Sequence, residues 1–218
     1  MLISSRNNKK FLSLIIILYF LMFFCSDSYA LQQITLVDDF ESSNTKASWW
    51  VFGNAEISIR KNSEEMKPEF GNFSLGVISE TSSWYGGGFG RDLPPSISRG
   101  VIKYFCIDVW GDGTISDIIA IKLVDDDNDN NVAEDDIDKT LLYDDEWTYK
   151  RIINWKGWKR LRIGLDRFED SNPGVGDDKW NPEKTSRSQG LLKINVICLS
   201  KEESESVKFK IDNIGFCQ

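Results

Sequence analysis

The chain has 218 residues and a formal net charge of −8, with 26 basic residues, 34 acidic residues and no histidine. An acidic chain is a poor partner for nucleic acid or anionic membrane surfaces, because both carry negative charge themselves. The absence of histidine excludes a Ser-His-Asp or Cys-His catalytic arrangement, and without a C-x-x-C motif a zinc site is not expected either.

Residues 1–30 have the pattern of a secretory signal peptide. Three basic residues precede an apolar stretch over residues 11–24, and Ser28 and Ala30 are the small residues expected before a cleavage site. The apolar stretch is shorter than the roughly 20 residues that span a bilayer, so we expect cleavage, no membrane span, and a secreted or periplasmic protein. Removal of this segment leaves residues 31–218, the size of one domain, with a net charge of −10.

After residue 31, nearly every apolar segment has the length and the β-branched or aromatic content of a strand, with turn residues at its ends. We predict strands over residues 34–39, 49–60, 73–79, 84–91, 101–110, 117–124, 139–143, 147–153, 158–165, 191–199 and 206–215. One short helical turn is expected at 165–170, and no segment keeps a helical period over three turns. This pattern predicts an all-β fold, a single-domain antiparallel β-sandwich or jelly roll.

A local repeat predicts one hairpin within this sandwich. The pattern Trp-x-x-x-Arg-Ile begins at Trp147 and again at Trp158, and the turn-like residues 154–157 lie between the two copies. Two strands of similar pattern joined by a short turn are typical of a β-hairpin. We therefore expect these two strands to be neighbours in one sheet.

The predicted domain contains three cysteines, Cys106, Cys198 and Cys217, an odd number for an oxidising compartment. Cys198 is in phase with the apolar residues of its predicted strand, which indicates burial as a small hydrophobic residue. A disulfide between Cys198 and either of the other two is the alternative, because sequence does not fix the connectivity.

Each end of the predicted domain is a short strand with a carboxylate at its edge. Residues 34–42 read ITLVDDFES and contain Glu41, whereas residues 207–216 read VKFKIDNIGF and contain Asp212. Because domain termini often lie close together, the two carboxylates can share one oxygen-lined cation site. The opening DFE and the closing IDNI resemble carbohydrate-binding modules with a galactose-binding-like jelly roll, the family 11 type and its relatives.

This resemblance implies a structural calcium ion held by both ends of the chain, with Glu41 and Asp212 as side-chain ligands. Asp39 is in phase with Glu41 and is a third candidate. Residues 71–75 look like the family's G-x-x-S-L turn, in which a carbonyl, here that of Asn72, completes the oxygen shell that calcium prefers. The alternative is that these are solvated carboxylates at a strand edge.

Two long loops interrupt the strands, at residues 125–136 and 171–182, and loops of this length are often functional. The first loop begins with carboxylates at the alternate positions of a calcium-binding loop, namely Asp125, Asp127 and Asp129. However, Asn130 replaces the turn glycine of an EF-hand, and Asp136 stands where a bidentate glutamate is expected. The loop is therefore a candidate for a second calcium ion, with a flexible, ion-free surface loop as the alternative.

The chain has eight tryptophans, several of them beside glycine or charged residues rather than in apolar segments. Sugar recognition combines flat apolar rings with a few polar side chains that fix the hydroxyl groups. We predict that the glycan contacts come from Trp84, Tyr85, Trp158 and Trp180, with Arg91 as their polar partner. The remaining candidates for the core are Trp49, Trp50, Trp110 and Trp147, and core packing is the alternative role for each ligand candidate.

Three functions compete on this sequence. The first, which we favour, is an exported, non-catalytic domain that binds a polysaccharide or glycan, alone or beside a separately encoded enzyme or envelope protein. The second is a calcium-stabilised envelope or protein-interaction β-sandwich without glycan binding; complex I intermediate-associated proteins share this general architecture without its sugar-binding role. The third is a small glycoside hydrolase, for which Asp108 is the best candidate for a buried acid, although no motif singles out a carboxylate pair.

Overall fold

The computed structural model describes residues 34–42, 45–63, 71–98, 102–136, 140–202 and 205–217. The predicted signal peptide lies outside these ranges. Among the described residues, no helix is long and apolar enough to cross a membrane.

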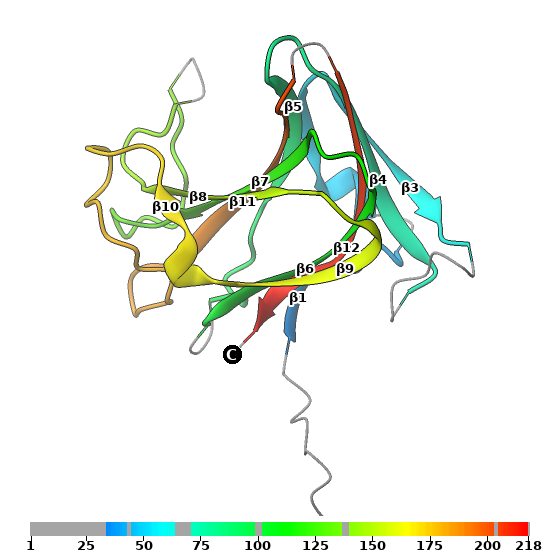
Figure 1. Ribbon diagram of the computed structural model, residues 1–218. Coiled ribbons are helices and arrows are strands. Elements are labelled where there is room, and N and C mark those ends of the chain that lie inside the picture. Colours follow the sequence, from blue (N-terminus) through cyan, green and yellow to red (C-terminus); the bar gives the residue numbers. More distant parts are fainter. Residues whose placement is uncertain are drawn as a thin grey trace, which may run out of the picture. The chain divides into compact units, whose positions relative to one another are not determined.

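Two antiparallel sheets pack face to face (Figure 1). Sheet A has the strand order β3-β4-β12-β6-β9, with β1 also paired to β12, and sheet B has the order β10-β8-β7-β11-β5-β2. The strands are β1 Ile34–Asp38, β2 Trp50–Gly53, β3 Ala55–Lys61, β4 Phe73–Glu80, β5 Tyr85–Asp92, β6 Tyr104–Asp112, β7 Asp117–Asp125, β8 Glu146–Ile152, β9 Lys156–Gly164, β10 Glu169–Asp170, β11 Leu191–Ser200 and β12 Ser206–Cys217. Two short 3-10 helices complete the described elements, η1 Thr45–Ser48 and η3 Leu165–Arg167. The predicted antiparallel β-sandwich and the short turn of helix after residue 165 are therefore confirmed.

The core lies between the sheets and follows from the alternation of apolar residues along each strand. In β7, Ile119, Ile121 and Leu123 are fully buried, and Phe105 and Phe216 are buried on the facing strands of sheet A. Each side chain of this size contributes about 1.5–3 kcal/mol when it leaves water. The period of two that predicted the strands thus also decides which side chains face the other sheet.

The first and last strands are neighbours, as predicted. β1 pairs with β12 in an antiparallel register that places Ile34 opposite Cys217 and Asp38 opposite Ile214. On its other side, β12 pairs with β6. The two ends of the domain therefore meet in sheet A.

The predicted hairpin at residues 147–165 is wrong, because β8 belongs to sheet B and β9 to sheet A. The residues between the two strands are anchored in the sandwich instead of forming an exposed turn. Ile153 is 1% exposed and donates its N–H to the Asp117 carbonyl, and the Trp155 ring N–H donates to the Val109 carbonyl. Packing of these two apolar side chains in and against the core takes the chain across from one sheet to the other.

Two strand predictions also need correction. The segment predicted as one strand at 49–60 is divided at Gly53, whose φ of +65° breaks the strand between β2 in sheet B and β3 in sheet A. The predicted strand at 139–143 is absent from its described part, where Leu141 forms only an isolated bridge with Asp135.

Cys106 of β6 and Cys217 of β12 form a disulfide that closes 111 residues of sequence separation. Cys198 is free and fully buried, in the core between the sheets. Its predicted burial is confirmed, and neither of the disulfides considered for it is formed. Burial raises the pKa of the Cys198 thiol to about 12, so it is an inert packing residue.

Candidate functional site

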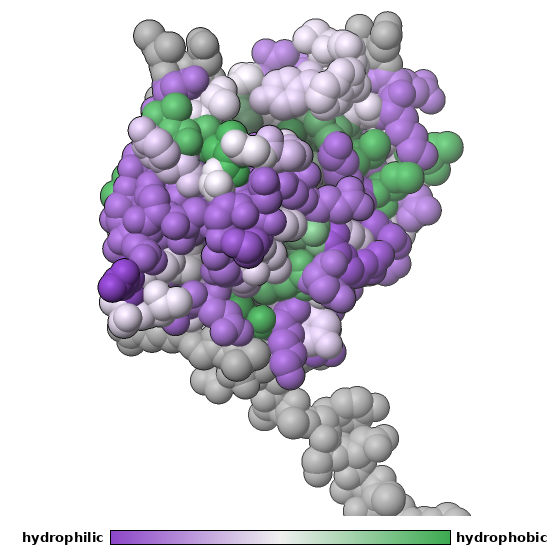
Figure 2. Space-filling model, turned by 90° about the vertical axis from the view of Figure 1, so that its left-hand side faces the viewer, coloured by the Kyte–Doolittle hydropathy of each residue, from purple (hydrophilic) through white to green (hydrophobic). Residues whose placement is uncertain are grey.

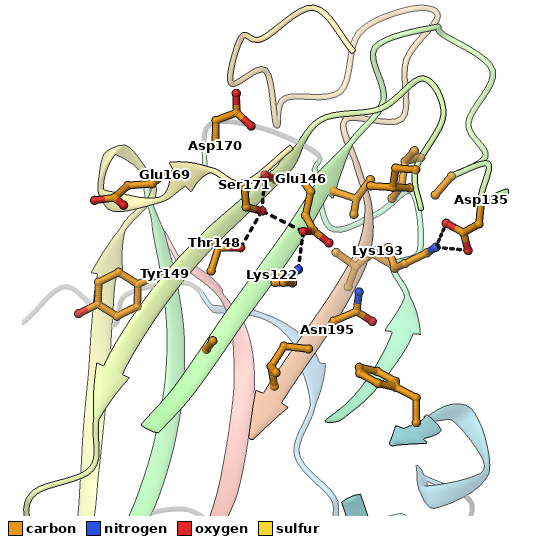
Figure 3. Close-up of a pocket in the computed structure, with 18 of the residues that line it drawn as sticks. Lys122, Asp135, Glu146, Thr148, Tyr149, Glu169, Asp170, Ser171, Lys193 and Asn195 are labelled. Atoms are coloured by element: carbon orange, nitrogen blue, oxygen red, sulfur yellow. Dashed lines mark hydrogen bonds and ion pairs between the residues drawn. The ribbon is translucent and has the colours of Figure 1, made fainter. Parts of the chain in front are cut away.

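The outer face of sheet B carries a groove of about 1680 Å³. Its floor consists of outward-facing side chains of β7, β8 and β11, and its rim includes β2, β5 and parts of the loops that follow β7 and β10. Figure 3 shows its polar side chains rising from β7, β8 and β11 toward the loops. Figure 2 views the molecule from the left-hand side of Figure 1, and this face is mainly hydrophilic with smaller hydrophobic patches.

Aromatic rings line one end of this groove. Trp50 and Phe52 come from β2, and Trp84 and Tyr85 come from the start of β5, with Trp84 60% and Trp50 39% exposed. The rings of Trp84 and Tyr85 meet edge to face, with their centroids 5.9 Å apart. Exposed rings at one end of a groove provide flat apolar surfaces that water leaves readily.

Glycines in β5 make room for the rings of β2. A Cβ at Gly88 would lie 2.9 Å from a ring carbon of Phe52, and a Cβ at Gly90 would lie 2.9 Å from the ring nitrogen of Trp50. The glycine-rich sequence of this strand therefore allows the two rings to lie across it. Beside Phe52, the floor continues as an apolar strip that consists of Ala120, Ile197 and Leu199.

The other end of the groove is polar. Lys122 pairs with Glu146 at 2.5 Å, and the Ser171 hydroxyl donates to the same carboxylate oxygen at 2.9 Å (Figure 3). The Thr148 hydroxyl donates in turn to the Ser171 oxygen at 2.9 Å. These contacts hold donors and acceptors in fixed positions along the strands, as hydroxyl recognition requires.

The polar rim is balanced in charge. The groove is lined by five basic side chains, Lys122, Lys150, Arg151, Arg167 and Lys193, and five acidic ones, Asp92, Asp135, Glu146, Glu169 and Asp170. Lys193 lies 3.3 Å from both carboxylate oxygens of Asp135. The side-chain amide of Asn195 lines the groove and forms no hydrogen bond within the described ranges, and its oxygen lies against Gly90. A groove of this composition favours a neutral, hydroxyl-rich molecule over a charged one.

The structure brings together two of the five predicted glycan contacts, since Trp84 and Tyr85 both line the groove. Trp158 lies on sheet A, opposite Trp110 of β6, and so belongs to the other sheet. Trp180 packs against the core, with its ring 5.2 Å from that of Trp147.

Arg91 is also outside the groove and has a structural role. Its guanidinium pairs with Asp38 at 3.0 Å and lies over the ring of Trp49, 5.4 Å from the centroid. The Trp49 ring N–H donates to the same Asp38 carboxylate at 2.9 Å. Arg91, Trp158 and Trp180 therefore lie outside this groove.

Sequence reasoning missed several groove residues. Trp50 was predicted to be a core residue, but it lies on the edge strand β2, is exposed and lines the groove. Lys122 and Asn195 are polar residues on the outward phase of otherwise apolar strands. Polar residues at these outward positions were the signal in the sequence for the polar end of the groove.

The carboxylates at the two ends of the chain meet as predicted and fit a hard divalent cation. A Cβ at Gly71 would lie 2.8 Å from Glu41 Oε1 and 3.1 Å from Asp212 Oδ2, so both oxygens approach one point. Asp212 is fully buried, and its Oδ2 has no hydrogen-bond partner among the described atoms. Burial, with the charges of Asp108 and Glu41, raises the pKa of Asp212 to about 8. A bound cation would offset the cost of burying this carboxylate in its charged form.

The other predicted ligands at this site are placed less directly. Glu41 Oε1 also accepts the backbone N–H groups of Asn72 and Phe73, at 2.7 and 2.8 Å. The Asn72 carbonyl accepts the N–H of Asn62 at 2.7 Å and keeps one lone pair. Asp39 is half-buried and accepts the Glu41 N–H at 3.2 Å.

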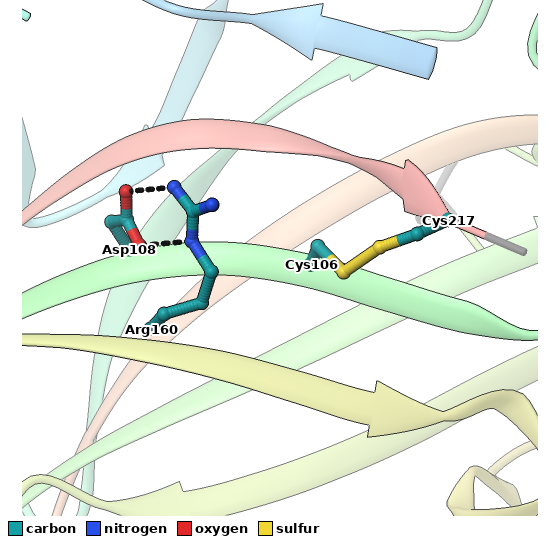
Figure 4. Close-up of a disulfide and its surroundings, with 4 residues drawn as sticks. All are labelled: Cys106, Asp108, Arg160 and Cys217. Atoms are coloured by element: carbon teal, nitrogen blue, oxygen red, sulfur yellow. Dashed lines mark hydrogen bonds and ion pairs between the residues drawn. A yellow bond between two sulfur atoms is a disulfide. The ribbon is translucent and has the colours of Figure 1, made fainter. Parts of the chain in front are cut away.

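Asp108, the candidate catalytic acid, is part of a structural ion pair. Both of its oxygens accept from Arg160, at 2.7 and 2.6 Å, beside the disulfide on sheet A (Figure 4). The Asn213 side-chain amide donates to the same carboxylate at 2.9 Å. A carboxylate whose two oxygens are both engaged by one arginine is not free to act as a catalytic acid.

The predicted acidic-loop ligands are partly assembled. Asp125 and Asp127 lie with Asp145 in one cluster, with an oxygen of each carboxylate within 4.8 Å of the others. Asp129 is exposed and does not belong to it. Asp145, which precedes β8, was not predicted, because it lies far from the loop in sequence.

No protein-family model matches the sequence, and a search of curated proteins finds no match. The family 11 carbohydrate-binding module from Clostridium thermocellum, in complex with a β-1,3-1,4-mixed-linked tetrasaccharide, is 16% identical, with a TM-score of 0.52 over 84% of this chain and 94% of that chain. The solution structure of CtCBM11 is 15% identical, with a TM-score of 0.50 over 87% of this chain and 97% of that one. The CBM22-1–GH10 modules of Clostridium thermocellum xylanase 10B, complexed with xylohexaose, are 12% identical, with a TM-score of 0.50 over 85% of this chain and 28% of that one. The fold predicted from the two ends of the chain is confirmed: this is the jelly-roll β-sandwich of the family 11 and family 22 carbohydrate-binding modules.

Proposed function

We propose that this protein is an exported, non-catalytic carbohydrate-binding domain that binds a neutral, β-linked polysaccharide in the groove of sheet B. The observation that carries the proposal is the groove itself, with exposed rings at one end and fixed polar side chains at the other. The likeness to a module solved with a mixed-linked tetrasaccharide makes mixed-linked β-glucan the first ligand to test.

The two ends of the groove suit the two faces of a sugar chain. Pyranose rings present C–H faces that stack on aromatic rings, here those of Trp50, Trp84 and Tyr85. Their hydroxyl groups would bind to the polar end, where Asn195 is unpartnered and Lys122 and Glu146 hold each other in place. Stacking on a few open rings supports only modest affinity, with a Kd on the order of 10 μM to 1 mM.

Binding without cleavage is supported by the ion pairs of two of the five groove carboxylates and of Asp108. Asp135 and Glu146 in the groove are engaged in ion pairs with lysines, and Asp108 is held by Arg160 on the other sheet. A glycosidase needs a pair of carboxylates free to act as acid and as base or nucleophile. We also propose that calcium at Glu41 and Asp212 joins the two ends of the domain, and that the segment over residues 1–30 directs export.

The test is affinity electrophoresis of the purified protein through gels that contain soluble polysaccharides, with calcium present. Mixed-linked β-glucan, xylan and a galactomannan give a panel of neutral ligands. We expect retardation by at least one of them and no release of reducing ends. Trp50→Ala and Trp84→Ala should each be retarded less, because each substitution should weaken the binding free energy by at least about 1 kcal/mol.

Trp158→Ala is the matched control, because it removes a partly exposed ring of the same kind from the opposite sheet. It should leave retardation unchanged. Equal losses in Trp50→Ala and Trp158→Ala would contradict binding in the groove. No retardation by any polysaccharide would favour the protein-interaction function, and release of reducing ends would favour the hydrolase.

A further inference from the structure

Three carboxylates gather where the loops that follow β7 and β10 meet the start of β8. Asp125 is the last residue of β7, Asp127 follows in the loop, and Asp145 directly precedes β8. Residues 174–181 cover this cluster. A Cβ at Gly176 would lie 2.3 Å from both Asp127 Oδ2 and Asp145 Oδ1, so these two carboxylates point to one small space.

Each carboxylate of the cluster is held through one oxygen. Asp125 Oδ2 accepts the Asn181 N–H at 2.8 Å, and Asp145 Oδ2 accepts the Lys179 N–H at 3.0 Å. Asp127 Oδ2 accepts the Asp145 N–H at 2.7 Å. The backbone therefore fixes the orientation of all three side chains before any ligand is present.

The remaining oxygens of the two buried members have no partner. Asp125 and Asp145 are both 0% exposed, and the Oδ1 atom of each is without a hydrogen bond among the described atoms. Within the described ranges, no lysine or arginine forms an ion pair with Asp125, Asp127 or Asp145. Buried carboxylate oxygens of this kind are normally paired or bound to a metal, because desolvated charge without a partner is unfavourable.

The electrostatics agree with this geometry. Burial, with the charges of neighbouring carboxylates, raises the pKa of Asp125 to about 8 and that of Asp145 to about 7. The Asn181 side-chain amide lies beside the cluster and, with its nitrogen turned inward, donates to Asp125 Oδ2 at 2.7 Å. With its oxygen turned inward, it supplies a fourth hard ligand.

We propose that Asp125, Asp127, Asp145 and Asn181 bind a calcium ion that fastens the loop after β10 to the loop after β7. All four supply oxygen, and no sulfur or imidazole is present, which selects a hard cation. The site is separate from the one at Glu41 and Asp212 and does not depend on glycan binding.

The loop that the ion would hold continues directly into the polar end of the groove. The Asn172 side chain accepts the Glu146 N–H at 2.5 Å and donates to the Asp144 carbonyl at 2.9 Å. Ser171, its neighbour, donates to Glu146. Calcium bound at Asp125 and Asp145 would therefore also hold Glu146 and Ser171 in place.

Isothermal titration of the chelator-treated protein with calcium chloride gives the number of ions bound per chain. Asp145→Asn keeps the size of the side chain and removes its charge, and circular dichroism checks that the variant is folded. We expect it to bind one calcium ion fewer than the unmodified protein. Equal stoichiometry and affinity in the two proteins would overturn the proposal.

Gly176→Ala tests the same space without changing any of the four proposed calcium-binding residues. Its methyl group would occupy the space between the two carboxylates, so we expect at least a tenfold loss of calcium affinity at one site. Gly174→Ala is the matched control, because Gly174 has a similar φ, +86° against +76°, and nothing lies within 4 Å of its Cβ position. Equal calcium binding by the two variants would overturn the proposed location.

Hydrogen exchange reports the fastening of the loop. Calcium should slow exchange of the backbone amides over residues 172–181 in the unmodified protein but not in Asp145→Asn. Identical exchange with and without calcium in the unmodified protein would overturn the proposal.

Discussion

Replacing both Cys106 and Cys217 by alanine should lower the free energy of unfolding by about 5 kcal/mol. The disulfide closes a loop with a sequence separation of 111 residues. In the chain-entropy model, a closed loop of that length removes about 16 cal/mol/K from the unfolded state, which is about 5 kcal/mol at 25 °C. The effect is large because β6 lies near the middle of the chain and β12 at its described end.

Urea denaturation followed by tryptophan fluorescence measures the loss. With an m value of about 2 kcal/mol/M, the midpoint should fall by about 2–3 M. A reducing agent should lower the midpoint of the unmodified protein and leave that of the double variant unchanged. Cys198→Ala is the control, since this buried thiol is unpaired and its loss should cost only about 1 kcal/mol, without sensitivity to reducing agent.

A loss below about 1 kcal/mol in the double variant would refute the reasoning. It would mean that the unfolded chain already keeps β6 and β12 close together, so that the disulfide removes little freedom.

Three further predictions concern the charged groups. Calcium at one hundred times its Kd should stabilise the native state by about 2.7 kcal/mol per site, and Asp212→Asn should abolish the share due to the terminal site; identical melting curves with calcium and with chelator would contradict this. Burial raises the pKa of Asp117 to about 6, so the free energy of unfolding should fall by at most about 3 kcal/mol as pH rises from about 4 through 6. Urea denaturation at both ends of this range measures the fall, and Asp117→Asn should lack the part of it that residue 117 causes. Arg160→Met should cost about 3–5 kcal/mol by leaving the buried Asp108 without its cationic partner, and adding Asp108→Asn should restore most of it; no recovery in urea denaturation would count against the ion pair as the cause.

From the sequence, the positions of the strands and their buried side chains were predicted better than the pairing of the strands. Alternation along a strand reports which side chains are buried, and that was enough to place Cys198 in the core and to define a sandwich. It does not report the neighbouring strand. The repeated pattern at Trp147 and Trp158 indicated a hairpin, although Ile153 and Trp155 between them are apolar and carry the chain into the other sheet.

The candidate site was harder to predict for the same reason. Exposure of a tryptophan depends on what the neighbouring strands place around it. Trp50 is exposed because β2 is an edge strand, whereas Trp180, in a loop rich in glycine and aspartate, is held by Trp147 and Phe168. Asp145 could not be joined to Asp125 from the sequence, since their contact requires β7 and β8 to pair.

The strands at the centre of both sheets come last in the chain, and this order bears on how the protein is made. β11 lies between β7 and β5, and β12 lies between β6 on one side and β4 and β1 on the other. A nascent chain that stops before Leu191 would therefore leave each sheet open along its middle, with unpaired strand edges that invite aggregation. Folding therefore has to wait until β11 and β12 are available to pair, and the pairing of Ile34 with Cys217 makes it a slow, non-local process.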